Sequence, residues 1–105
     1  MFFSVRRRSI TESVTLRRKD WGSFIEDTFS VKQIGELIAF CKNIKPDVLI
    51  MVDNCYGEFV ETQEPSDVGA DMIVGSLIKN PGGGLASSGG YIAGTRACID
   101  RCAYR

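Results

Sequence analysis

Two charged residues end apolar runs in this sequence, and their types suit covalent or acid–base chemistry. Asp53 closes the run "DVLIMVDN" (residues 47–54), and Lys79 follows the run "GADMIVGSL" (residues 69–77). An unpaired ammonium buried at the tip of a strand costs free energy, so Lys79 needs a structural or functional reason. A lysine amine can form a Schiff base with a carbonyl compound, and desolvation favours the neutral amine that this attack requires.

Asp53 and Lys79 are expected to face one crevice, because ligands of open α/β sheets bind outside the carboxyl ends of the strands. The pair could be a structural ion pair, or two charges that mark where each strand reaches water. It could also serve pyridoxal 5′-phosphate, whose chemistry needs a lysine amine and a carboxylate that keeps the pyridine nitrogen protonated. The residues alone leave these alternatives open.

The residues around Lys79 extend this candidate site. Ser76 lies three positions earlier, where its hydroxyl can donate to a phosphate, and the glycines at 82–84 allow their backbone amides to approach a ligand or a neighbouring subunit closely. A nucleotide-binding loop of the form G-x-x-x-x-G-K-[ST] does not fit, because Asn80 follows Lys79 where a hydroxyl is required.

The elements that must position these residues alternate between helix and strand. Ser30 and Gln33 have capping-box spacing, and apolar residues then recur at helical intervals as far as Ile44, just before Pro46. The two apolar runs are typical of parallel strands covered on both faces, and enough residues separate them for a crossover.

The end of the chain predicts a change of strand direction. The loop after Lys79 is too short for a packed crossover helix, so "GYIAG" (residues 90–94) should run antiparallel, and Thr95 can cap a helix over residues 96–105. The predicted order is helix, strand, crossover, strand, antiparallel strand, helix. This is an α/β fold with a mixed, mostly parallel sheet.

Residues 1–29 are expected to be a poorly specified lead-in to the domain at 30–105. They carry no sustained hydrophobic period, although Met1–Val5 could form a strand. They also hold two basic clusters, at residues 6–8 and 17–19. A solvated surface explains these clusters more simply than a nucleic-acid patch does.

Composition narrows the function classes. The 105 residues suit one small domain, and 13 basic residues balance 13 acidic ones, which gives no net field to attract nucleic acid or an anionic membrane. No apolar stretch reaches the length of about 18 residues that spans a bilayer, so we expect a soluble, cytoplasmic protein without nucleic-acid or membrane partners. The four cysteines lack C-x-x-C spacing and no histidine is present, which disfavours a metal site and favours free thiols in a reducing compartment.

Two longer segments resemble a known family. "VDNCYGEFVE" (residues 52–61) and "GADMIVGSLIKNPGGGLASSGGYIAG" (residues 69–94) are similar to the aluminium-resistance or methionine gamma-lyase-like proteins. This family is a cystathionine beta-lyase-like branch of the fold-type-I pyridoxal-phosphate enzymes. The resemblance covers residues from about 31 to 105. It implies that the chain is an internal fragment of the cofactor-binding large domain.

The resemblance also implies roles for individual residues. Lys79 would bond covalently to pyridoxal 5′-phosphate, Asp53 would contact the pyridine nitrogen, and Ser76 would contact the phosphate. Tyr56 and Asn54 would lie near the cofactor, although packing or turn formation explains each of these two side chains equally well.

The activity that the family implies is elimination of a sulfur leaving group from the beta or gamma carbon of an amino-acid substrate such as cystathionine or methionine. Full-length relatives would be homo-oligomers. Family enzymes are several times longer, and this chain shows no counterpart of their substrate-binding arginine, so we expect it to be inactive alone. The alternative is a small α/β binding or interaction module without catalysis.

Overall fold

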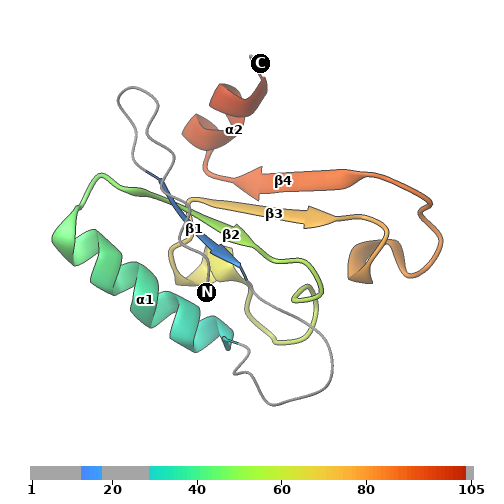
Figure 1. The fold of residues 1–105 in the computed structure, drawn as a ribbon, viewed down its shortest axis with the longest axis horizontal. Coiled ribbons are helices and arrows are strands. Elements are labelled where there is room, and N and C mark those ends of the chain that lie inside the picture. Colours follow the sequence, from blue (N-terminus) through green and yellow to red (C-terminus); the bar gives the residue numbers. More distant parts are fainter. Residues whose placement is uncertain (1–12, 18–28, 104–105) are drawn as a thin grey trace.

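The structure, a computed structural model, describes residues 13–17 and 29–103 (Figure 1). Its centre is a four-stranded sheet in which the strands lie in sequence order. The first three strands run parallel and the fourth is antiparallel to the third, as the arrows in Figure 1 show. The elements are β1 (Ser13–Arg17), α1 (Val31–Ile44), β2 (Leu49–Asp53), β3 (Met72–Ser76), β4 (Gly90–Gly94) and α2 (Arg96–Ala103).

Helix α1 begins at a complete capping box. Ser30 Oγ accepts a hydrogen bond from the Gln33 amide at 3.2 Å, and Gln33 Oε1 accepts one from the Ser30 amide at 2.8 Å. The buried face of the helix packs on the sheet, and each fully buried isoleucine contributes about 1.5–3 kcal/mol. The core cluster consists of Ile34, Ile38, Val48, Ile50, Val52 and Ala70.

Two short 3-10 helices, η1 (Pro65–Val68) and η2 (Asn80–Gly82), shape the connections that follow β2 and β3. Helix α1 lies very close to η1, because a Cβ added at Gly35 would be 3.0 Å from the Cβ of Val68. The connection from β2 to β3 is therefore held against α1. Only η1 occurs within it, so the predicted crossover contains no α-helix.

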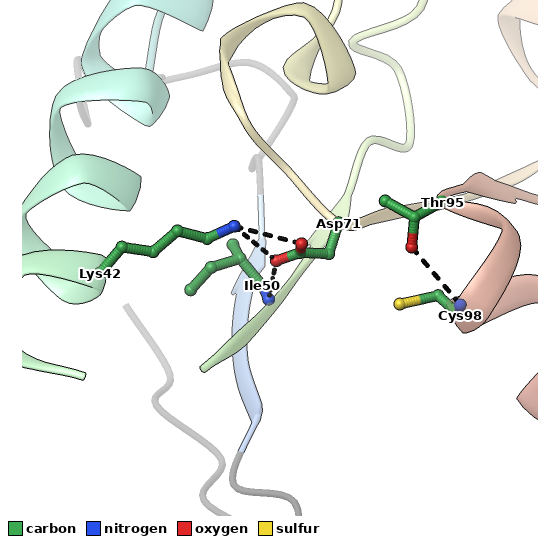
Figure 2. A network of polar contacts seen from close by, with 5 residues as sticks. All are labelled: Lys42, Ile50, Asp71, Thr95 and Cys98. Carbon is green, nitrogen blue, oxygen red and sulfur yellow. Dashed lines mark hydrogen bonds and ion pairs between the residues drawn. The ribbon is translucent and has the colours of Figure 1, made fainter. Parts of the chain in front are cut away.

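Asp71 joins three elements at the amino end of β3 (Figure 2). Its carboxylate accepts hydrogen bonds from Lys42 Nζ on α1, at 3.0 and 3.1 Å, and from the backbone amide of Ile50 on β2, at 2.8 Å. Its carbonyl accepts a hydrogen bond from the Thr95 amide at 2.9 Å, and Thr95 in turn caps α2 through the Cys98 amide. Asp71 thus fixes the edge of the sheet opposite the carboxyl ends of β2 and β3.

The predicted fold class is confirmed, including the antiparallel last strand and the cap at Thr95. The strands are shorter than the apolar runs, although β2 does end at Asp53. The main difference is β1, which lies within the expected lead-in and pairs with β2 along its whole length. The strand predicted at Met1–Val5 lies outside the described residues, as do residues 104 and 105 of the predicted last helix.

Candidate functional site

The candidate site lies where the chain leaves β2 and β3. Asp53 is the last residue of β2 and pairs in register with Val74 of β3. Lys79 follows the end of β3 by three residues, and its backbone amide donates to the Ser76 carbonyl at 3.4 Å. Because the two strands are parallel, both loops leave the same edge of the sheet, as predicted (Figure 1).

The side chain of Asn80 connects the two loops. Its Nδ2 donates to the carbonyl of Tyr56 at 3.1 Å and to the carbonyl of Glu58 at 3.0 Å. The adjacent Lys79 places its Nζ over the ring of Tyr56, 4.5 Å from the ring centroid. A cation in this position is attracted by the electron-rich face of the ring.

Cys55 lies between the acid and the base. The Asp53 carboxylate accepts the Cys55 backbone N–H at 3.2 Å, and the Cys55 thiol lies close enough to Asp53 and Lys79 for both to shift its pKa. Burial raises the pKa of the Cys55 thiol, the hydrogen bond to Asp53 raises it further, and the Lys79 ammonium opposes both. Asp53 and Lys79 therefore act on a shared thiol.

The pKa of Lys79 differs from what the sequence predicts. The sequence predicts that desolvation favours the neutral amine, but the pKa of Lys79 is raised above its ordinary value. The hydrogen bond to Cys55 is the largest cause, and it outweighs desolvation, which does act in the predicted direction. The contact with Cys55 therefore favours the ammonium form of Lys79.

Ser76 and Asn54 occupy different positions relative to Lys79. Ser76 is half-buried at the end of β3, at the start of the turn that leads to Lys79. Asn54 is only 1% exposed, and its Nδ2 donates to Glu64 at 2.8 Å. The structure thus shows a packing role for Asn54, and its predicted contact with a cofactor stays a prediction.

A buried polar layer supports the loop after β2. Glu58 is 4% exposed, and its Oε1 accepts the Tyr91 hydroxyl of β4 at 2.8 Å. Burial raises the pKa of Tyr91 far above its ordinary value, and the bond to Glu58 adds to this. Gly75 makes the arrangement possible, because a Cβ there would collide with both side chains. Within the described residues, Asn54 Oδ1 and Glu58 Oε2 are buried without a hydrogen-bond partner.

Sequence reasoning missed four residues that shape this site. The sequence predicts only that the four cysteines, Cys55 among them, are free thiols, and Asn80 enters only as the residue that excludes a nucleotide-binding loop. The available signal was position: Cys55 stands two residues after Asp53, and Asn80 directly follows Lys79. No signal in the sequence identified Glu58 or Tyr91, because their contact joins positions that are 33 residues apart.

Comparisons with known proteins agree with the resemblance found in the sequence. The methionine gamma-lyase family matches residues 5–105. A solved structure from Listeria monocytogenes, described as a candidate cystathionine beta-lyase involved in aluminium resistance, is 54% identical with a TM-score of 0.82 over 94% of this chain and 24% of its own. A carbon-sulfur lyase involved in aluminium resistance from Clostridium novyi is 48% identical with a TM-score of 0.80, over 88% of this chain and 21% of its own.

A relative found by sequence is also much longer than this chain. The protein YnbB of Bacillus subtilis is 55% identical over 78 residues, which are 74% of this chain and 18% of YnbB. The chain therefore spans about a quarter or less of the length of each of these three proteins. Among the described residues, no helix has the length and apolarity needed to cross a membrane.

Proposed function

This chain belongs to the methionine gamma-lyase family, and we propose that it carries cofactor-holding residues of a pyridoxal-phosphate-dependent carbon–sulfur lyase acting on sulfur amino acids. The observation that carries the proposal is that Lys79, Tyr56 and Asp53 lie together at the carboxyl ends of β2 and β3. The names of the Listeria and Clostridium proteins support a lyase. Elimination at the beta or gamma carbon and a cytoplasmic location belong to the same proposal.

The residues present fit pyridoxal phosphate. Lys79 supplies an amine that lies over an aromatic ring rather than inside the core. Asp53 supplies a half-buried carboxylate that its contact with the Cys55 amide holds at the strand end. Ser76 supplies a hydroxyl near the start of the glycine-rich loop. An amine, a carboxylate and a hydroxyl are the groups that the cofactor's aldehyde, ring nitrogen and phosphate require.

Each residue then has a definite task. Lys79 would hold the cofactor through its amine. Once the substrate has displaced it, the free amine would accept the alpha proton of the substrate on Nζ. Asp53 would keep a proton on the ring nitrogen by a charge-assisted hydrogen bond. Ser76 would donate to the phosphate, and the Tyr56 ring would line the site. The cofactor itself supplies an electron sink for carbanion chemistry.

The test uses the purified 105-residue chain, pyridoxal phosphate below the protein concentration, and borohydride reduction followed by peptide mapping. We expect the label mainly on Lys79. Lys32 is the matched reference, because it is exposed on α1 and would be labelled first if accessibility alone decided. Lys42 is engaged by Asp71 and Lys45 by Asp47, at 3.0 and 3.6 Å, so both should label poorly.

Two variants complete the test. Lys79→Ala should remove most of the label, whereas Lys32→Ala should leave the yield at Lys79 unchanged. A label spread evenly over the lysines, or concentrated on Lys42 or Lys45, would contradict the assignment. The binding-module alternative would then explain the chain better.

A further inference from the structure

The loop after β2 contains two residues in an unfavourable backbone conformation. Tyr56 has a φ of 64° and Phe59 a φ of 63°, and both are non-glycine residues in the left-handed region. Bulky side chains avoid this region, and such residues persist only when their surroundings hold them. Within the loop, the Gly57 amide donates to the Asn54 carbonyl at 2.8 Å and closes the turn around Tyr56, and a contact from outside the loop adds to this support.

Asn80 provides this contact. Its Nδ2 donates one hydrogen bond to Tyr56 and one to Glu58, and both acceptors are backbone carbonyls. Only the NH₂ end of an amide can face two carbonyls, so the orientation of the Asn80 side chain is set by its partners. The backbone of Asn80 is held as well, because its own carbonyl accepts the Gly83 amide at 3.2 Å within η2.

The loop is anchored a second time at Glu58. Its buried carboxylate accepts the Tyr91 hydroxyl from β4 while its carbonyl accepts Asn80. The Glu58 end of the loop is thus fixed to the sheet. The Tyr56 end is fixed to Asn80, the residue that directly follows Lys79. The Lys79 amine, one residue before Asn80, lies over the ring of the Tyr56 that this connection holds.

We propose that Asn80 is a positioning residue: its amide holds the left-handed Tyr56 beneath Lys79 and so sets the place from which the Lys79 amine reacts. The reactive role of Lys79 rests on the proposed function, whereas the placement does not. Asn80 itself is assigned no contact with substrate or cofactor.

Two substitutions distinguish the loss of the Asn80 hydrogen-bond donors from a change in the size of the side chain. Asn80→Ala removes both hydrogen bonds. Asn80→Asp keeps the shape, but an ionised carboxylate can only accept and would face two carbonyl oxygens. Both variants should release Tyr56. Thr95→Ala is the control, because it weakens the α2 cap at the opposite edge of the sheet without touching this loop.

The first measurement needs no cofactor. Protons on the Lys79 side chain near a ring face are shifted upfield in the NMR spectrum, relative to those of the exposed Lys32. We expect this shift to disappear in Asn80→Ala and Asn80→Asp and to remain in Thr95→Ala. A shift that persists in both Asn80 variants would overturn the proposal.

A second measurement uses the unmodified chain, so it stands even if the variants fail to fold. The side chains of Asn80 and of Asn43 on α1 are both exposed, so the two hydrogen bonds of Asn80 should make its side-chain amide protons exchange with solvent more slowly than those of Asn43. Equal exchange rates for the two amides would overturn the proposal, because the two hydrogen bonds would then not persist in solution.

The link to reactivity is measured by borohydride labelling. In the Asn80 variants the ratio of label at Lys79 to label at Lys32 should fall by about tenfold or more, since a misplacement of about 1 Å can cost about 100-fold in rate. If unmodified protein shows no preference for Lys79, the proposed function fails while the placement can still be confirmed by NMR. If the preference exists and the Asn80 variants keep it, the positioning role is wrong.

Discussion

Replacing Asp71 with alanine should destabilise the chain far more than replacing its partner Lys42. The Asp71 side chain is 16% exposed and accepts hydrogen bonds from both Lys42 and the backbone amide of Ile50. Asp71→Ala removes both interactions at once. Lys42→Ala removes only the ion pair and leaves the bond from Ile50 in place.

The expected magnitudes follow from burial. Ile50 is fully buried, so an orphaned amide there costs about 1–3 kcal/mol. The Lys42 side chain is 34% exposed, so the ion pair contributes only about 0.2–1 kcal/mol to stability. We therefore expect about 1–4 kcal/mol for Asp71→Ala and about 1 kcal/mol or less for Lys42→Ala. Asp71→Asn retains an acceptor for Ile50 and should lie close to Lys42→Ala.

Urea unfolding followed by circular dichroism measures these differences, provided that the slopes of the transitions match. The double variant of Asp71→Ala and Lys42→Ala should cost little more than Asp71→Ala alone, because the ion pair is lost already. If Asp71→Ala and Lys42→Ala are equally destabilising, the Ile50 amide does not depend on Asp71 and the reasoning fails.

Two further substitutions probe the site itself. Cys55→Ala removes the main cause of the raised pKa of Lys79, so the amine should become neutral at lower pH and the pH midpoint of Lys79 acylation should move downward; an unchanged midpoint would contradict the shared-thiol contact. Gly75→Ala forces a Cβ into Tyr91 and Glu58 and should cost about 1–3 kcal/mol by overpacking, measurable as a lower urea midpoint. A stability equal to that of the parent chain would mean that the two side chains move aside freely.

The features that the sequence predicted correctly depend on local signals. The Ser30–Gln33 cap and the strand end at Asp53 each arise from residues that are neighbours along the chain. Strand β1 was missed because its sequence, SVTLR, holds only two apolar residues and ends in a basic cluster, whereas the equally short β2 lies in a long apolar run. Its pairing partner also lies more than thirty residues away. Short strands of this kind are defined by their neighbours rather than by their own sequence.

The chemistry of the site was predicted in part for the same reason. Residue types and strand ends pointed to Asp53 and Lys79, but the direction of the Lys79 pKa depends on a thiol 24 positions earlier in the chain. The left-handed Tyr56 was equally hidden, because tyrosine is not a residue that signals positive φ. Tertiary contacts decide both properties.

Strand β3 is anchored at both ends, by Asp71 before its first residue and by the turn to Lys79 after its last. Its five residues span about 17 Å at about 3.3 Å each. Inserting or deleting one residue would shift one anchor along the strand and turn every later side chain to the other face of the sheet. The length of this segment is therefore fixed by the contacts at its two ends, and a one-residue change in length would disturb the site at Lys79 even if every side chain in the strand were kept.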